Sequence, residues 1–251
     1  GTDDFNINVT QASVLDGGED SDTFTVAAGA TLTGAGIRLT GGVDADSDAS
    51  GAGGDDTDVL NVAAAGTGGT VTVALSGSEA NLGFEGSEDT VFTDDGTFAR
   101  IDSVVGSAND TLQGRNVAST WTQTTYTDGN PRALAFSGFG TAAGGTDTDT
   151  LQGGAGADVF AVTAAGSVTL NSAQAFTGIE TLSGLGGADD FNLDADFAGA
   201  VNGDGGTDDF NINVTQASVL DGGEDSDTFT VAAGATLTGA GIRLTGGVDA
   251  D

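Results

Sequence analysis

Short stretches of alternating apolar and polar residues dominate the chain. In residues 5–9 the side chains of Phe5, Ile7 and Val9 alternate with two asparagines, and residues 22–26 repeat this pattern. A period of two residues is typical of a β-strand with one buried face. No segment carries an apolar stripe of helical period between capping residues. The sequence therefore predicts an all-β protein.

A second regularity spaces these strands along the chain. An aspartate followed two places later by a large apolar side chain recurs, and most gaps are about 19 residues or about twice that length. The aspartates are Asp3, Asp22, Asp58, Asp89, Asp110, Asp149, Asp158, Asp189, Asp208 and Asp227. A second motif, at Phe98, Phe136 and Phe176, recurs at about twice the same spacing. Two motifs that share one spacing predict a coil of about 19 to 20 residues.

Short strands, glycine-rich turns and a fixed coil length favour a parallel β-solenoid of the β-helix or β-roll kind. We expect phenylalanines to line its interior and strands one coil apart to pair in parallel. A string of antiparallel β-sandwich domains is the alternative. Sandwich domains give no reason for a motif to recur at a fixed coil length.

A much longer repeat encloses this pattern. Residues 1–46 and 206–251 are identical at every position, so residues 1–205 form one full repeat and residues 206–251 begin the next. Identity of this kind indicates a tandem array, and we expect the chain to be a window of a longer one. The motif spacing from Asp189 to Asp208 crosses the repeat boundary unchanged, which predicts stacking without a hinge.

Two regions interrupt the pattern. Residues 41–58 form an acidic loop without large apolar residues across its centre. Residues 113–143 contain the only Trp and Tyr, and predict a hairpin or protruding segment around the turn at Asp128 and Gly129. Trp121 either covers an irregular coil or takes part in a lateral or sugar contact.

The charge of the chain is strongly one-sided. Thirty-eight acidic residues stand against five arginines, for a net charge of −33, and there is no Lys, His or Cys. This balance excludes nucleic acid and anionic membrane surfaces as partners, because both are bound through clusters of Lys and Arg. No apolar run reaches the ~18 residues of a membrane span. The composition fits binding of divalent cations or adaptation to high salt.

Residues 144–152 and 153–161 are two adjacent nine-residue units in one frame. Each begins with a glycine pair, which permits a turn with positive φ, and has an aspartate at its sixth place, Asp149 or Asp158. We expect this aspartate to face outward from the turn. The pattern resembles the GGxGxDxUx nonapeptide of calcium-binding RTX repeats. The second unit matches at every place, whereas the first has Asp147 in place of a glycine.

This resemblance implies calcium, which takes carboxylate and carbonyl oxygens in loose geometry. The first set of candidate ligands is Asp147, Asp149, Asp158, Asp189, Asp190, Asp208 and Asp209. A second set is Asp20, Asp22 and Asp58 with the duplicates Asp225 and Asp227. The alternative is that these are solvated acidic turns that bind no metal.

Asp44, Asp46, Asp48 and Asp55 have the spacing of places 1, 3, 5 and 12 of an EF-hand loop. Ala49 stands where that loop needs a glycine, an aspartate replaces the final glutamate, and no helices flank the segment. The four residues form either a single ion site or an acidic loop.

The chain is similar to giant RTX-like extracellular repeat proteins of bacteria, and the resemblance implies secretion, folding assisted by Ca²⁺ and a mechanical or adhesive role. We expect a structural segment of a filament or matrix fibre whose partner is itself. The alternative is the stalk of an adhesin with a binding head elsewhere, with polysaccharide or the cell surface as a contact. Enzyme activity is not expected, because acidic side chains at this density single out no catalytic pair.

Overall fold

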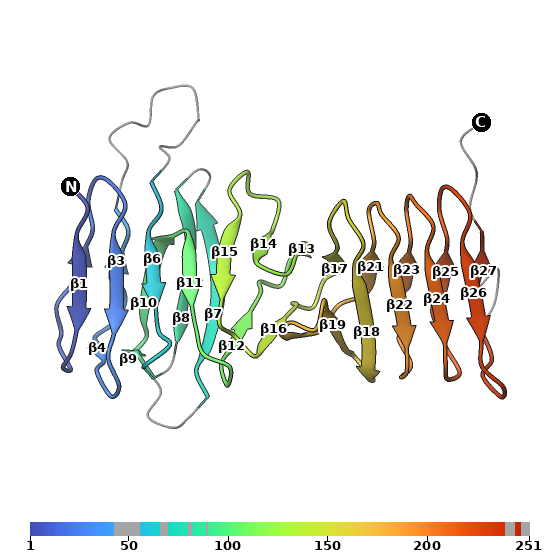
Figure 1. Cartoon of the computed structure of the whole chain (residues 1–251). Coiled ribbons are helices and arrows are strands. Elements are labelled where there is room, and N and C mark those ends of the chain that lie inside the picture. Colours follow the sequence, from blue (N-terminus) through green and yellow to red (C-terminus); the bar gives the residue numbers. More distant parts are fainter. Residues whose placement is uncertain (43–55, 66–69, 80–81, 89, 239–243, 247–251) are drawn as a thin grey trace. The chain divides into compact units, whose positions relative to one another are not determined.

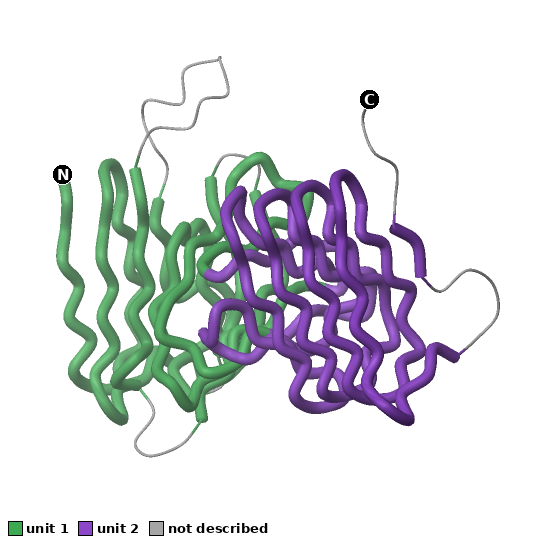
Figure 2. The backbone as a smooth tube through the Cα atoms, turned by 45° about the vertical axis from the view of Figure 1, so that its right-hand side comes forward, with its two compact units in different colours: residues 1–115, 124–142 green, residues 116–123, 143–251 purple. Residues whose placement is uncertain are grey.

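A computed structural model describes residues 1–42, 56–65, 70–79, 82–88, 90–238 and 244–246. These residues form strands, turns and bends without any helix, so the described chain has no helix that could cross a membrane. The chain divides into two compact units (Figure 2). Unit 1 comprises Gly1–Arg115 and Thr124–Ala142, and unit 2 comprises Asn116–Gln123 and Ala143–Asp251. The prediction of an all-β protein is confirmed.

Unit 1 contains two long rows of hydrogen-bonded strands and one short pair. The first row is β1 (Asp4–Ile7), β3 (Thr23–Val26), β6 (Val59–Asn61), β11 (Ser103–Val105), β15 (Leu134–Ser137) and β14 (Thr125–Thr127). The second row is β2 (Leu15–Asp16), β5 (Gly36–Thr40), β10 (Gly96–Ile101), β8 (Gly83–Glu88), β7 (Thr72–Glu79) and β12 (Thr111–Gln113). The short pair is β4 (Leu32–Thr33) with β9 (Phe92–Thr93).

Unit 2 also contains two rows. One is β13 (Ser119–Trp121), β17 (Asp149–Gln152), β21 (Thr181–Ser183), β23 (Ala200–Asn202), β25 (Val219–Asp221) and β27 (Leu244–Thr245). The other is β20 (Ala175–Thr177), β19 (Ser167–Leu170), β18 (Val159–Ala164), β22 (Asp190–Leu193), β24 (Asp209–Ile212) and β26 (Thr228–Val231). The remaining strand, β16 (Thr141–Ala143), lies where the chain passes from unit 1 to unit 2.

Strands one motif spacing apart pair in parallel, as the sequence predicts (Figure 1). Asp190 in β22 is the register partner of Asp209 in β24, which partners Thr228 in β26. The strands β21, β23 and β25 repeat the same step in the other row. The chain alternates between the rows, so each passage of one motif spacing, here called a coil, adds one strand to each row.

Longer passages carry antiparallel hairpins. In unit 1, β7 pairs antiparallel with β8 and β8 with β10, and in unit 2, β18 pairs antiparallel with β19 and β19 with β20. These strands use the extra residues where the gap between motifs exceeds one coil. The sequence predicted the parallel pairing but did not predict these hairpins.

Aromatic rings stack along the interior from coil to coil. Phe160 and Phe191 have ring centroids 4.8 Å apart, Phe191 and Phe210 4.8 Å, and Phe210 and Phe229 4.5 Å. Phe24 is also fully buried and stacks on Phe5 at 4.7 Å. Burial of a Phe side chain stabilises a fold by about 1.5–3 kcal/mol, and a well-placed ring pair adds about 0.5–1.5 kcal/mol.

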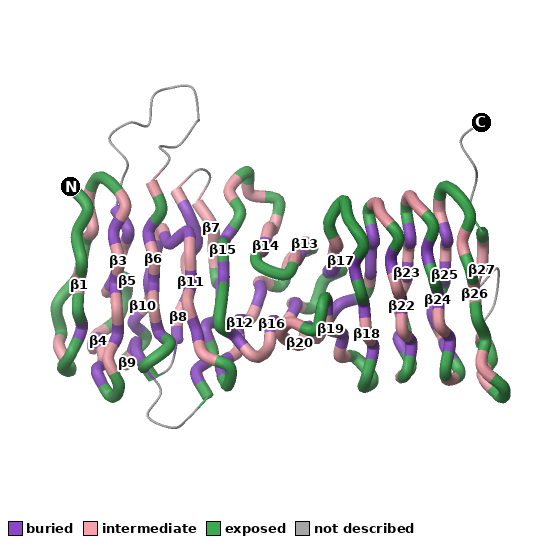
Figure 3. Tube along the Cα trace, viewed as in Figure 1, coloured by how far each residue is buried: buried purple, intermediate pink, exposed green. Residues whose placement is uncertain are grey.

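The predicted inward orientation is confirmed for Phe24, Phe160, Phe191 and Phe210, whose side chains are fully buried. Buried positions recur along the strands of both units (Figure 3). Phe5 and Phe229 stack in the same way but are only half-buried. Their strands, β1 and β26, are the last of their rows, so each has a neighbouring strand on one side only.

The segment 113–143 contains the predicted hairpin, because β14 pairs antiparallel with β15 and Gly129 in the connecting turn has a φ of 86°. Tyr126 is fully buried in unit 1, where its ring lies 5.7 Å from that of Phe84. Trp121 is fully buried in unit 2. Neither ring lies at the surface, where a sugar could stack on it.

The two identical segments form equivalent strands in the two units, except that the counterpart of β4 at Leu237 is a single bridge. The strands β1 and β3 correspond to β24 and β26, and a bridge between Gln11 and Leu32 corresponds to one between Gln216 and Leu237. Around residue 205, bridges join Gly186 to Gly205 and Gly205 to Glu224. The repeat boundary therefore lies inside continuous strand pairing.

Candidate functional site

A row of aspartates immediately precedes the strands β18, β22, β24 and β26 of unit 2. Asp158, Asp189 and Asp208 are buried, and Asp227 is half-buried. Each of the first three donates its backbone N–H to a carboxylate oxygen of the next, at distances of 2.7, 2.8 and 3.0 Å. We call these four residues the unit 2 aspartate ladder.

Unit 1 has an equivalent ladder before β1, β3, β6 and β11. The N–H of Asp3 donates to Asp22 Oδ1 at 2.7 Å, and the N–H of Asp22 donates to Asp58 Oδ1 at 2.9 Å. The N–H of Asp58 in turn donates to Asp102 Oδ2 at 3.0 Å. The other oxygen of Asp102 lies 2.7 Å from Nε of Arg132, so this ladder ends in an ion pair.

Backbone chemistry explains why a carboxylate stands at this position. The N–H that precedes a buried strand must find an acceptor, because an unpaired buried N–H is costly. A carboxylate on the neighbouring coil supplies it, and a hydrogen bond to a charged acceptor stabilises by about 1.5–3 kcal/mol. The aspartate of the sequence motif therefore joins successive coils.

In the unit 2 ladder, the glycine five places before each aspartate makes room for its side chain. A Cβ built on Gly153, Gly184 or Gly203 would lie less than 3.0 Å from the Oδ2 atom of the aspartate that follows, closer than Cβ atoms come. At Gly203 a Cβ would also overlap the carbonyl oxygen of Gly222. The expected positive φ is not found at Gly153 or Gly154, so space, rather than backbone conformation, requires the first glycine.

Burial changes the protonation of the ladder. Loss of solvation raises the pKa of Asp189 to about 6 from 3.8, opposed by the N–H of Asp158 and reinforced by the charge of Asp208. Burial likewise raises the pKa of Asp22, Asp149 and Asp208. Within the described residues, Oδ2 of Asp22, Asp189 and Asp208 has no hydrogen-bond partner, which leaves the ionised form poorly compensated.

The prediction that the aspartate at the sixth place of each nine-residue unit, Asp149 or Asp158, faces outward from its turn is therefore wrong. Asp22, Asp58, Asp149, Asp158, Asp189 and Asp208 are all buried. The physical reason is the unsatisfied N–H at each strand start, which draws the carboxylate toward the neighbouring coil. Asp149 shows both halves of the arrangement, because its own N–H donates to Glu180 Oε2 at 2.9 Å and its carboxylate accepts a hydrogen bond from the backbone of Ser119, the first residue of β13.

Other candidate ligands remain accessible to solvent. Asp20, Asp147, Asp209 and Asp225 are exposed, and Asp190 is half-buried as the register partner of Asp209. Asp44, Asp46, Asp48 and Asp55 lie outside the described residues, so the EF-hand-like spacing stays a prediction. In the described part of the chain, no three acidic side chains are grouped closely enough to hold a metal ion. Calcium binding also stays a prediction.

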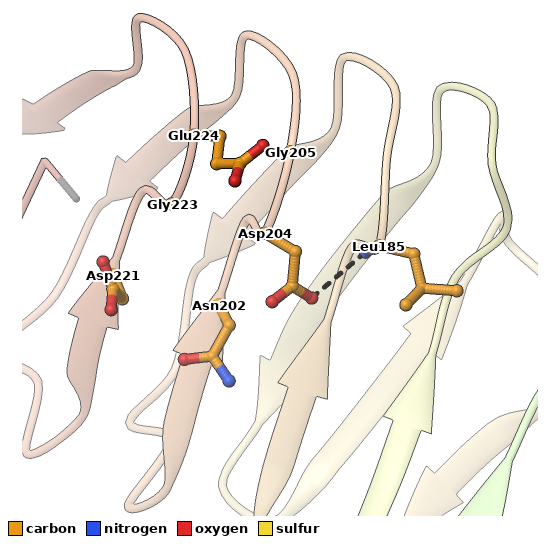
Figure 4. Close-up of a pocket in the computed structure, with 7 residues that line it drawn as sticks. All are labelled: Leu185, Asn202, Asp204, Gly205, Asp221, Gly223 and Glu224. Atoms are coloured by element: carbon orange, nitrogen blue, oxygen red, sulfur yellow. Dashed lines mark hydrogen bonds between the residues drawn. The ribbon is translucent and has the colours of Figure 1, made fainter. Parts of the chain in front are cut away.

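A groove of ≈ 410 Å³ crosses the turns of unit 2, lined by Leu185, Asn202, Asp204, Gly205, Asp221, Gly223 and Glu224 (Figure 4). Asp204 has a positive φ of 68°, and its Oδ2 accepts hydrogen bonds from Ser183 Oγ and from Leu185 N. The carboxylate of Asp204 thus ties two successive turns together. None of the three acidic residues of the groove was among the predicted ligands.

Sequence reasoning also missed the roles of Asp102 and Glu180. Both accept a strand-start N–H, from Asp58 and Asp149 respectively. Their signal was visible in the second motif, where an acidic residue follows a Phe-x-x-Ile run at both places.

The ladders hold carboxylates away from solvent, where they serve as acceptors for backbone donors. This chemistry joins one coil to the next along each unit. Comparison with protein-family models, with curated proteins and with solved structures finds no match for this chain.

Proposed function

We propose that this chain is a β-solenoid segment of an extracellular filament or matrix fibre, and that it acts through its length and self-association rather than by catalysis. The observation that carries the proposal is the stacking of coils across the repeat boundary. The step from Asp189 to Asp208 crosses that boundary, and the step from Asp208 to Asp227 lies inside the next repeat. Both have the same spacing and the same hydrogen bond.

The phenylalanine stack supports the same conclusion. Phe191 belongs to one repeat, whereas Phe210 and Phe229 belong to the next, and the rings continue with centroid distances of 4.8 and 4.5 Å. A coil in a solenoid contacts only its neighbours, so an array of identical repeats can lengthen without new kinds of contact. The alternative function, an adhesin stalk, uses the same rod and differs only in a binding head.

Secretion and calcium are further parts of the proposal. Their support is the RTX-like sequence pattern, the accessible carboxylates of Asp20, Asp147, Asp209 and Asp225, and the net charge of −33 that opposes compaction. A cation that binds only the folded state adds about 2.7 kcal/mol per site at a hundredfold excess over its Kd. Sites of this kind would make folding depend on calcium outside the cell.

Electron microscopy of the native material tests the structural proposal. We expect continuous rods with an axial repeat of about 45–50 Å, since each coil rises about 4.8 Å. Globular beads joined by thin linkers would overturn it, and single rods ending in a distinct head would favour the stalk.

A separate melting experiment tests calcium. A chelator should lower the Tm, and calcium should restore it where NaCl of equal ionic strength does not. Restoration by NaCl alone would assign the acidic composition to salt adaptation.

A further inference from the structure

Three triplets of the form Asn-x-Thr occur in the chain, at residues 8–10, 109–111 and 213–215. The first and the last are the same triplet, Asn-Val-Thr, in the two identical segments. Asn-x-Ser/Thr, with any residue but proline in the middle, is the acceptor sequence for N-linked glycosylation in secreted proteins. A pattern this short also arises by chance, so its place in the fold decides whether it can act.

The triplet at 213–215 fills the bend between β24 and the bridge residue Gln216. The side chains of Asn213 and Thr215 are exposed, and Val214 between them is half-buried. This exposure does not come from a chain end, because β24 pairs with β22 on one side and with β26 on the other. A further coil would stack on β26, since a coil contacts only its neighbours, and would leave the triplet open.

The contacts of the two reactive side chains lie at the surface. Asn213 Nδ2 donates to Asp194 Oδ1 at 2.7 Å, and the hydroxyl of Thr215 pairs with that of Thr236 at 3.2 Å. The amide of Asn213 has two N–H groups, so one can carry a sugar while the other keeps the bond to Asp194. The fold can therefore hold a glycosylated Asn213 without losing this contact.

The same bend recurs in unit 1. Residues 8–10 lie between β1 and the bridge residue Gln11, and their side chains are exposed. The hydroxyl contact recurs as well, because Thr31 Oγ1 donates to Thr10 Oγ1 at 3.0 Å. One accessible triplet therefore belongs to each repeat.

The triplet that begins at Asn109 differs in its central residue, Asp110, which is 2% exposed. The two carboxylate oxygens of Asp110 accept the N–H groups of Val71 and Ser107 at 3.0 and 2.6 Å. Thr111 is the first residue of β12 and donates its N–H to the carbonyl of Val71 at 2.8 Å. An enzyme would have to break these bonds to bind the whole triplet, so the folded chain protects it.

We propose that Asn213 and its counterpart Asn8 each carry an N-linked glycan, one in every repeat, and that Asn109 carries none. This inference rests on secretion, which is part of the proposed function. A separate transferase supplies the sugar from a lipid-linked oligosaccharide diphosphate. The bond from Nδ2 to C1 of the sugar forms and the C1–O bond to the diphosphate breaks. One amide proton passes to a base of the transferase, the lipid diphosphate leaves, and nothing is oxidised or reduced.

Mass spectrometry of glycopeptides from the native material tests the proposal. Cleavage after Phe and Leu releases residues 6–15 and 211–220 as one identical peptide, and residues 99–112 as another. We expect sugar on the first peptide only, at Asn213 and not at Asn211, which has no Ser or Thr two places later. Absence of sugar from this peptide would overturn the proposal, and so would equal occupancy of the peptide that contains Asn109.

Variants made in the source cells separate the triplet from the asparagine alone. Thr10→Ala with Thr215→Ala should abolish the sugar, whereas Thr10→Ser with Thr215→Ser should keep it, because serine retains the hydroxyl. Sugar that persists in the alanine variant, or is lost from the serine variant, would overturn the proposal. Continuous rods without sugar would overturn this inference and leave the proposed function standing, and beads with sugar on Asn213 would do the reverse.

Discussion

Replacement of Asp189 by Asn should stabilise the protein at neutral pH. The side chain is 1% exposed, and one oxygen accepts the N–H of Asp158 at 2.7 Å while the other has no partner among the described residues. Asparagine keeps the acceptor and removes the charge.

The size of the effect follows from the raised pKa. The pKa of Asp189 rises from 3.8 to about 6, so the folded chain holds the proton more tightly than the unfolded chain. The resulting stability is fully present below about pH 4 and is lost as the pH rises through about 6. A shift of about two units corresponds to about 3 kcal/mol, which is the largest gain expected from Asp189→Asn at pH 7.

Urea denaturation between pH 4 and pH 7 measures this effect, with fluorescence of the single tryptophan, Trp121, reporting on unit 2, where it is fully buried. Asp209→Asn is the matched control, because Asp209 is exposed in the same row of strands. In the wild type the free energy of unfolding should decrease between pH 4 and pH 7. We expect Asp189→Asn to remove most of this decrease and Asp209→Asn to retain most of it. A variant that is less stable than the wild type at pH 7, with the same pH dependence, would refute the reasoning.

Three further substitutions test packing and charge, each by denaturation at fixed pH. Gly203→Ala should destabilise the protein by about 3 kcal/mol, because the new Cβ would overlap Asp208 and the carbonyl of Gly222. Its control is Gly205→Ala, whose Cβ would lie 3.6 Å from the nearest atom and which should change stability by less than about 1 kcal/mol. Equal effects of the two substitutions would contradict the packing role of Gly203. Phe191→Ala should lower the free energy of unfolding by about 3–5 kcal/mol, because the Phe191 ring stacks on a ring on each side. Phe229→Ala should lower it by less than half of that, because Phe229 is half-buried. A larger loss for Phe229→Ala than for Phe191→Ala would be inconsistent with the ring stack. Arg132→Met should cost about 3–5 kcal/mol, since it leaves Asp102 buried without its ion-pair partner, and an unchanged midpoint would show that this pair is not needed.

The sequence was sufficient to predict strands, their parallel pairing and the inward phenylalanines, because the alternation within each strand and the regular spacing between motifs are both visible in one dimension. The hairpins β7–β8 and β18–β19 were not predicted. The motif spacing shows that some passages are longer than one coil, but it does not show whether the extra residues form a loop outside the sheet or additional strands within it. The orientation of the aspartates was wrong for a related reason. A Gly-Asp turn has the same sequence whether its carboxylate binds a cation or a backbone N–H. Only the neighbouring coil, which is distant in the sequence, decides between them.

The direction of the ladder hydrogen bonds gives each coil two chemically different faces. In every step the N–H comes from the earlier coil and the carboxylate from the later one, as in Asp3 to Asp22 and Asp158 to Asp189. Two like faces brought together would set carboxylate against carboxylate or N–H against N–H. An array built on this bond is therefore polar, with one carboxylate-presenting end and one amide-presenting end. Growth, capping and attachment to a surface would each distinguish the carboxylate-presenting end from the amide-presenting end, and such an array would carry a built-in direction along its whole length.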